Sequence, residues 1–172
     1  MRLRFLAALT ALVAASACYE PIVPAERVWA NAVTSLAGLH PHTADVMRFD
    51  TETSFDRNGS LVVTTTGENP SFLLYEIKGA ELANSVTHYQ ARLKTKDLTG
   101  TASIEMRMRF PDKGTFSAFP KTPLEGTRDW VLQQASFWTD PGESPDRVYL
   151  MLKVEGTGTV WIDDLKLLRS PR

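Results

Sequence analysis

Two adjacent aspartates, Asp163 and Asp164, interrupt an apolar stretch near the C-terminus that reads GTGTVWIDDLKLL. Paired carboxylates can act as a general acid and base, hold a metal ion, or accept hydrogen bonds from backbone amides. Neighbouring side chains of a β-strand point to opposite faces of the sheet, so these two carboxylates cannot converge on one substrate bond. The pair therefore argues against acid/base catalysis and leaves two structural interpretations open, a metal site or a cap for loop amides.

The apolar residues on either side of this pair differ in phase. Val160 and Ile162 share one parity, whereas Leu165 and Leu167 share the other. If all four side chains face the core, the strand must slip by one residue between Ile162 and Leu165. A β-bulge produces such a slip, so the sequence predicts a bulge at the aspartates.

Alternation of apolar and polar residues predicts half-buried antiparallel strands over most of the chain after residue 45. Residues 89–95, 102–110 and 147–155 alternate most clearly, and residues 60–66, 71–77, 130–137 and 159–168 are further candidates. Turn residues separate these segments at residues 57–59, 67–70, 97–100, 111–114 and 140–142. Many short strands at near-even spacing predict an all-β fold, a β-sandwich of two antiparallel sheets.

Candidate ligand contacts come from aromatic residues outside the predicted core positions. Trp138 offers the largest stacking surface of the connecting segments, Asp140 follows it closely enough to accept a hydrogen bond from a sugar hydroxyl, and Tyr149 has outward parity. Trp130 is expected in the core, and Trp161 is left open. The outward positions of the two clearest strands carry Gln90, Arg92, Lys94, Ser103, Glu105, Arg107 and Arg109. Such residues favour a cross-strand charge lattice over a sugar site.

The N-terminus has the pattern of an export signal. Arg2 and Arg4 precede an uncharged apolar stretch at residues 5–17, which is too short to span a bilayer as a helix. The small residues before Cys18 suit either ordinary signal peptidase or a bacterial lipobox, although Ala15 stands where the lipobox most often has leucine. Cys18 is the single cysteine and has no disulfide partner, so we expect it to be the lipidated N-terminus of the mature chain.

Composition and motifs exclude several classes of function. Removing residues 1–17 takes two of the 19 basic side chains and none of the 20 acidic ones, which changes the net charge from −1 to −3. With that charge and no basic cluster, no nucleic-acid partner is expected. No nucleophile elbow or phosphate loop is present, so the sequence predicts no enzyme. His40 and His42 lack clustered ligands and are expected to be solvated loop residues.

The closing G-x-G-x-V-W-I-D-D-L-x-L strand resembles the last strand of carbohydrate-binding-module-like, or galactose-binding-like, jelly rolls. Residues 59–63, Tyr89 and residues 126–130 stand in the expected order, and the similarity covers about residues 46–169. In that family an acidic pair belongs to a structural calcium site that the first strand completes. The resemblance implies Asp164 as the carboxylate ligand, Asp163 as a backbone or outer contact, and Asp50 as the first-strand ligand.

The sequence thus predicts a signal peptide at residues 1–17, a lipidated tether with a possible short helix (residues 26–39) at residues 18–45, and a jelly-roll β-sandwich at residues 46–172. The expected function is non-catalytic recognition of a glycan or another extracytoplasmic ligand, with a membrane contact through the lipid. The alternative is a structural or assembly lipoprotein that binds an envelope protein. We expect a location in the bacterial envelope at the outer membrane, with a soluble periplasmic or secreted protein as the alternative. The only cofactor that we expect is a structural calcium ion.

Overall fold

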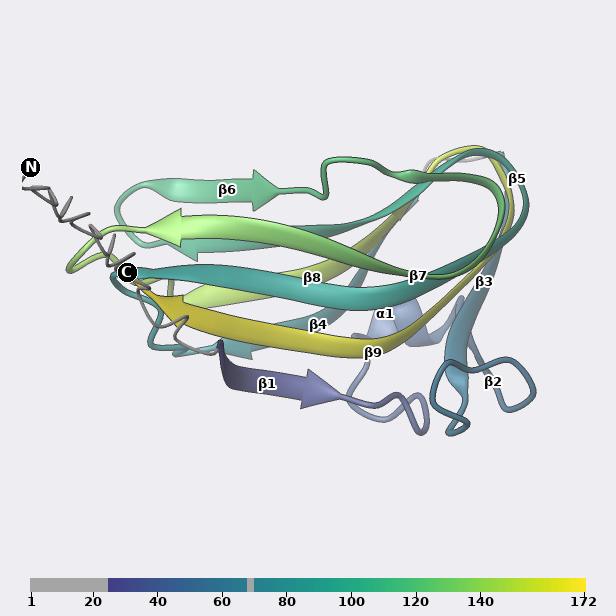
Figure 1. Ribbon diagram of the computed structural model, residues 1–172, viewed down its shortest axis with the longest axis horizontal. Helices are drawn as coiled ribbons and strands as arrows, with labels where there is room; N and C mark the ends of the chain where they lie inside the picture. The colour runs from purple at the N-terminus through teal and green to yellow at the C-terminus, as the bar shows by residue number, and fades with distance from the viewer. Residues whose placement is uncertain (1–24, 68–69) are drawn as a thin grey trace, which may run out of the picture.

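A computed structural model describes residues 25–67 and 70–172, and within them the chain is almost entirely β-strand. Figure 1 shows the strands arranged in two layers that meet where the long strand β5 bends. The elements in chain order are β1 (Glu26–Asn31), α1 (Pro41–Ala44), β2 (Arg48–Asp50), β3 (Ser60–Thr66), β4 (Ser71–Lys78), β5 (Ser85–Phe110), β6 (Gly114–Ala118), β7 (Leu124–Thr139), β8 (Arg147–Val154) and β9 (Thr157–Pro171). The predicted all-β jelly-roll sandwich is confirmed.

Every strand pairing is antiparallel, and β5 takes part in both layers. The front sheet consists of β1, β9, the first half of β5, and β7. The back sheet consists of β4, β8, the second half of β5, and β6. Strand β3 pairs with the first residues of β9, and β2 pairs with β3. Among the described residues, no helix is long and apolar enough to cross a membrane.

The predicted turn at residues 97–100 is instead a bend inside β5. Three register shifts against β7 and a positive φ of 53° at Asp97 turn the strand without ending it. The bend brings β5 very close to the turn between β8 and β9, and a Cβ on Gly100 would lie 2.3 Å from the carbonyl oxygen of Glu155 in that turn. A turn signal in the sequence therefore marked the place where one strand passes from the front sheet to the back sheet.

Alternation in β5, β8 and β9 places the apolar side chains between the two sheets. Tyr89, Ile104, Leu150 and Ile162 are fully buried, as their parity predicts. Glu105 is an exception, because it was expected to face solvent and is only 2% exposed. The Glu105 carboxylate accepts hydrogen bonds from the Arg107 Nε at 2.5 Å and from the hydroxyl of Ser117 on β6 at 2.8 Å.

The helix expected at residues 26–39 is wrong, because β1 begins at Glu26 and pairs with the outer edge of β9. Trp29 packs against Tyr75 with the ring centroids 4.8 Å apart, and the Asn31 amide donates to the Tyr75 hydroxyl at 3.0 Å. The apolar residues on the expected helical face are buried to different extents: Val33 lies in the core, and Val28, Trp29 and Leu36 are partly buried against it. Pairing with a distant strand outweighed a weak local helical pattern.

Candidate functional site

Strand β7 carries an outward row of alternate residues on the exposed face of the front sheet. The row consists of Trp130, Leu132, Gln134, Ser136 and Trp138, while Gln133 and Ala135 between them are buried. Trp138 is 62% exposed, the largest exposed fraction among the exposed large apolar side chains of the described residues. It was expected in a loop but lies in the strand, because β7 stays paired with β5 as far as Thr139.

Hydrogen bonds link uncharged side chains across the middle of this face. The Gln90 amide donates to Gln134 at 2.7 Å, and Gln134 donates to the Ser136 hydroxyl at 3.2 Å. The Nδ1 of His88 lies 2.8 Å from the same hydroxyl, and the Nε2 of His88 lies 3.4 Å from the hydroxyl of Ser170 on β9. Burial lowers the pKa of His88 and so favours its neutral imidazole. We call these five residues the polar ladder.

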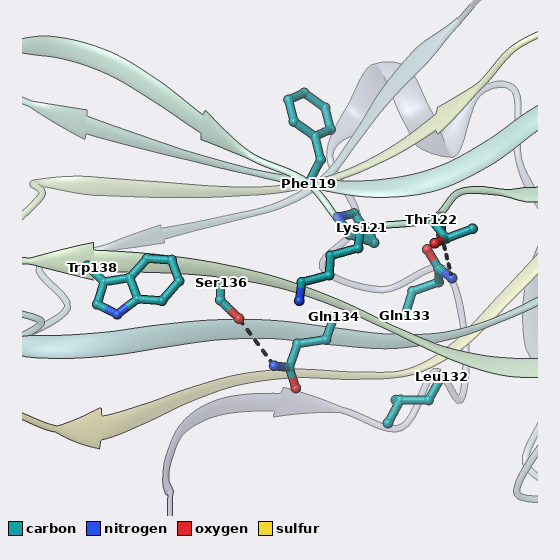
Figure 2. A pocket seen from close by; sticks show the side chains of 9 residues that line it. Phe119, Lys121, Thr122, Leu132, Gln133, Gln134, Ser136 and Trp138 are labelled. Atoms are coloured by element: carbon teal, nitrogen blue, oxygen red, sulfur yellow. Dashed lines mark hydrogen bonds between the residues drawn. The ribbon is translucent and has the colours of Figure 1, made fainter.

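A groove of about 510 Å³ runs between the outward row of β7 and the segment 119–122 that precedes this strand. Figure 2 shows Trp138 and Ser136 on one side of the groove and Lys121 extending its amine over it. The Gln133 amide donates to the Thr122 carbonyl at 3.3 Å and so ties the segment to β7. Phe119 points away from Trp138, and its ring has the Lys153 amine 5.9 Å from its centroid.

The opposite end of the β7 row carries a second aromatic group. Trp130 was expected in the core, but it is half-buried on the outer face, edge-on to Phe55 with the centroids 6.4 Å apart. The Arg92 guanidinium lies 4.1 Å from the Phe55 ring centroid. The outer face therefore offers an exposed indole at one end, a neutral polar ladder in the middle, and an arginine stacked on an aromatic ring at the other end.

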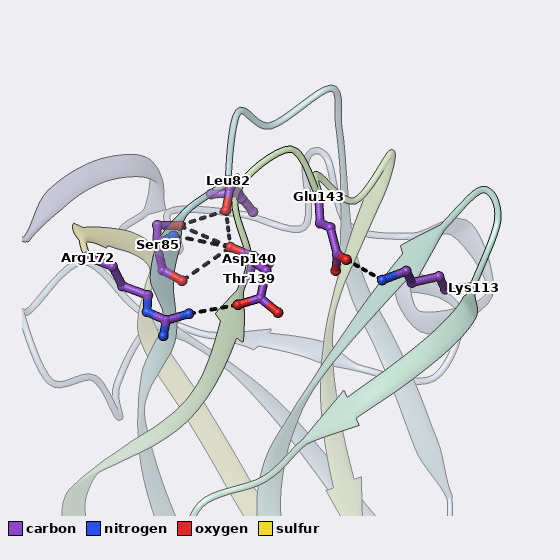
Figure 3. A network of polar contacts seen from close by, with 7 residues as sticks. All are labelled: Leu82, Ser85, Lys113, Thr139, Asp140, Glu143 and Arg172. Carbon is purple, nitrogen blue, oxygen red and sulfur yellow. Dashed lines mark hydrogen bonds and ion pairs between the residues drawn. The ribbon is translucent and has the colours of Figure 1, made fainter.

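Asp140 follows Trp138 in the chain, and its carboxylate accepts a hydrogen bond from the Arg172 guanidinium at 3.0 Å (Figure 3). In the same network the Thr139 hydroxyl donates to the Leu82 carbonyl, while Lys113 pairs with Glu143. The first two contacts hold the end of β7 to the β4–β5 loop and to the residue that follows β9, and the third joins the β5–β6 turn to the β7–β8 loop. Asp140 is exposed and lies two residues after Trp138 in the chain, and its carboxylate is bound to the side chain of Arg172.

Tyr149 has the outward parity predicted for it but belongs to the other layer. It lies on β8, opposite Arg107 of β5 and Glu76 of β4, on the outer face of the back sheet. That face carries ion pairs of Glu76 with Arg147, Glu105 with Arg107, and Arg109 with Asp146. The outer face of the back sheet therefore carries a lattice of charged side chains. Tyr149 lies in this lattice and not beside Trp138, which is on the front sheet.

The predicted bulge at the aspartate pair is confirmed. The β5–β9 register advances from Gln90 opposite Lys166 to Arg92 opposite Asp163, one residue more on β9 than on β5, and Asp164 has a positive φ of 51°. Asp163 is fully buried and accepts hydrogen bonds from the backbone amides of Phe55 at 2.8 Å and Asp164 at 2.6 Å. Burial raises the pKa of its carboxyl.

The three carboxylates predicted to bind calcium have separate partners. Asp50 accepts the Trp161 indole N–H at 2.8 Å and two backbone amides of its own loop, and Asp164 pairs with Lys166 at 2.7 Å. Within residues 25–67 and 70–172 no three His, Cys, Asp or Glu side chains are grouped as a metal site would require. The observed contacts suit the amide-capping interpretation of the pair, and calcium stays a prediction.

The sequence did not predict the polar ladder, because Trp138 was expected in a connecting segment and no role was assigned to His88. The signal was present in the alternation of β7, where every second residue from Trp130 to Trp138 has the same orientation. Extending the predicted strand through residue 138 would have placed Gln134, Ser136 and Trp138 on one face. The predicted signal peptide and Cys18 lie outside the described residues.

Comparison of the sequence with protein-family models and with curated proteins finds no match. Comparison of the fold with solved structures does find matches. The CBM22-1 xylan-binding domain from Paenibacillus barcinonensis is 14% identical with a TM-score of 0.55, covering 84% of this chain and 86% of that domain. A family 16 carbohydrate-binding module is 15% identical with a TM-score of 0.53, covering 70% of this chain and 84% of the module.

A putative sugar-binding protein from Bacteroides thetaiotaomicron is 12% identical with a TM-score of 0.52, covering 73% of this chain and 82% of that protein. At these identities the comparisons establish the fold of the described residues. The structural neighbours are carbohydrate-binding modules with a jelly-roll fold, in agreement with the resemblance seen in the closing strand.

Proposed function

We propose that this jelly roll, which shares its fold with carbohydrate-binding modules, is a non-catalytic domain that binds a glycan on the outer face of its front sheet. The observation that carries the proposal is the exposed indole of Trp138 at the end of the uncharged polar ladder. The proposal includes an envelope location for the protein, with Cys18 lipidated and held at the outer membrane.

The chemistry of the face suits a sugar in two respects. An indole is a flat apolar surface that can cover the apolar face of a pyranose ring, and Trp138 has most of its surface available for this. Gln90, Gln134 and Ser136 carry both donors and acceptors, as sugar hydroxyls do. Because these side chains already bond one another across two strands, little side-chain entropy remains to be lost when a ligand binds.

The contact between Ser136 and His88 does not make a catalytic pair. A serine nucleophile needs a base that a carboxylate or amide orients, whereas the second nitrogen of His88 faces the hydroxyl of Ser170 at 3.4 Å. The other side chain that hydrogen-bonds to the pair is the Gln134 amide, which contacts both His88 and Ser136. This supports a binding role for the face over a role in bond cleavage.

The test is glycan binding by the folded domain, measured on arrays and by affinity electrophoresis against neutral and acidic polysaccharides. Trp138→Ala is expected to weaken binding by about 1–3 kcal/mol, as for an exposed aromatic anchor, and to leave the free energy of unfolding almost unchanged. Tyr149→Ala is the matched control, because it removes an aromatic side chain from the opposite sheet. Loss of binding in Tyr149→Ala with full binding in Trp138→Ala would transfer the site to the back sheet.

A second candidate function is recognition of an envelope protein, and β6 favours it. This strand pairs only with β5 among the described strands, so its other edge is open, and it carries Phe116, which is 44% exposed. Open strand edges can pair with an extended segment of another protein. A well-folded protein that binds no glycan on the array would favour this alternative.

A further inference from the structure

Arg92 lies in the glycan face proposed above, and within residues 25–67 and 70–172 its side chain has no hydrogen-bond or ion-pair partner. Its neighbours Tyr89, Ala91 and Leu93 are buried, so Arg92 projects outward with His88 and Gln90, and it lies opposite Leu132 in the row of β7. The side chain is half-buried, and its Nε is buried without a partner. Buried side-chain donors normally have a hydrogen-bond partner, so the buried Nε of Arg92 is an exception.

The acidic side chains at this end of the sheet are bound to other groups. Asp129 pairs with Lys94 at 2.7 Å, and Asp164 pairs with Lys166 at 2.7 Å. Asp163, which lies opposite Arg92 in the register, is fully buried and receives two backbone amides. Among the described residues, no carboxylate forms an ion pair with Arg92, which is half-buried on this face.

The guanidinium of Arg92 is also held in a defined orientation. It lies 4.1 Å from the centroid of Phe55, and Phe55 is fixed by its own amide hydrogen bond to Asp163 and by the edge contact with Trp130. Stacking on an aromatic ring limits the rotation of an arginine and leaves its N–H donors free at the edge of the guanidinium plane. A planar donor group of this kind binds carboxylates in a bidentate manner.

We propose that Arg92, mounted on Phe55, is a subsite for a sugar carboxylate, so that the ligand is an acidic polysaccharide containing uronic acid. This inference rests on the proposed function, because the same face binds the rest of the chain. On β5, Arg92 and Val86, the partner of Trp138, are six residues apart, which corresponds to about 20 Å. A ligand that reaches both the indole and the guanidinium must therefore be a chain of several sugars.

The experiment compares uronate polysaccharides with their own neutral forms. Polygalacturonate, alginate and hyaluronan are each tested beside a carboxyl-reduced sample of the same polymer, by affinity electrophoresis and calorimetry. The wild-type domain is expected to bind at least one uronate polymer about tenfold or more tightly than the carboxyl-reduced form of that polymer. A hydrogen bond to a charged group contributes a factor of about this size to affinity. This preference is expected to weaken as the salt concentration approaches about 1 M, where charges are screened.

Arg92→Gln is expected to remove the preference for the uronate form, so that this variant binds the uronate polymer and its carboxyl-reduced form equally. Arg92→Lys keeps the charge but not the planar donor pair, so it is expected to recover only part of the preference. Lys78→Gln on the back-sheet strand β4 is the matched control for the change in net charge, and it should behave as wild type. Thermal melting of each variant verifies that it is folded.

Two results would overturn the inference while leaving the proposed function intact. One is wild-type binding that does not distinguish a polymer from its carboxyl-reduced form. The other is an equal loss of both forms in Arg92→Gln. Selective binding of sulfated glycans alone would overturn the uronate assignment. Absence of glycan binding to any polymer, neutral or acidic, would overturn the proposed function, and the inference with it.

Discussion

Asp50, at the end of β2, shows how one carboxylate organises a loop. Its side chain accepts the Trp161 indole N–H of β9 and the amides of Glu52 and Thr53. The bond from Trp161 lowers the pKa of the Asp50 carboxyl, and the loop amides lower it further, against the opposing effect of burial. The charged form of Asp50 is therefore the form that stabilises the folded chain.

A lowered pKa in the folded state means that the unfolded chain binds the proton more readily. The stabilisation by Asp50 is thus present above the unfolded pKa of about 4 and is lost as the pH falls through the lower pKa of the folded state. We expect Asp50→Ala to lower the free energy of unfolding by about 1–3 kcal/mol at pH 7, and by less at low pH. Urea unfolding at both pH values measures this. An equal penalty at both values would show that the charge of Asp50 does not matter.

The calcium prediction for Asp50, Asp163 and Asp164 also belongs to the residue scale. A metal that binds only the folded state stabilises it by an amount that grows with the logarithm of the ratio of metal concentration to Kd, so chelation would lower the melting temperature. Asp164→Asn would lower the melting temperature in calcium and remove the response to chelator. A melting curve that changes neither with chelator nor with added calcium would leave only the hydrogen bonds described above as the role of the three carboxylates.

At the scale of elements, β1 is the unexpected component of the front sheet. Its backbone pairs with residues 165–169 of β9, the segment that follows the aspartate bulge. Its side-chain contribution centres on Trp29, which is half-buried against Tyr75. Without β1, this edge of β9 would be open in the described part of the chain.

We expect Trp29→Ala to cost about 2 kcal/mol of unfolding free energy, less than a fully buried tryptophan because Trp29 keeps part of its exposure. Ala30→Ser, an exposed change in the same strand, is the control and should stay within about 0.5 kcal/mol of wild type. Urea unfolding measures both, and hydrogen exchange of β9 reports whether the pairing loosens. Equal values for the two variants would indicate that β1 adds no packing energy to the sandwich.

At the scale of the whole molecule, the proposed role depends on where the domain is held. Export and lipidation at Cys18 would place the sandwich at the end of a tether on the envelope, where a polysaccharide is accessible. Several acyl chains give firm membrane anchoring, whereas one chain alone gives marginal binding.

Cys18→Ser is therefore expected to leave the precursor uncleaved or to release the protein from the membrane. Mass spectrometry of the wild-type N-terminus and fractionation of both forms measure this. An unmodified thiol at position 18 in the mature wild-type protein would contradict lipidation and favour the soluble periplasmic or secreted alternative.

The sequence alone determined the properties that depend on the parity of neighbouring residues. The sequence predicted β3 at its observed bounds, period-two alternation predicted the buried faces of β5, β8 and β9, and the change of phase around Asp163 located the bulge. These predictions succeeded because side-chain direction in a strand is a local property of the backbone. The shared fold of the carbohydrate-binding modules was likewise visible in the closing strand.

Only the tertiary structure decided which strands pair and which sheet face stays uncovered. The pairing of β1 with β9, the continuity of β5 through its bend, and the position of Trp130 on the outer face all depend on segments far away in the chain. The same holds for the site, because Trp138, His88 and Arg92 share a face only through the register between β7 and β5. The strand register and the choice of which sheet face is buried depend on packing between residues that are far apart in the chain. A local sequence pattern does not determine that packing.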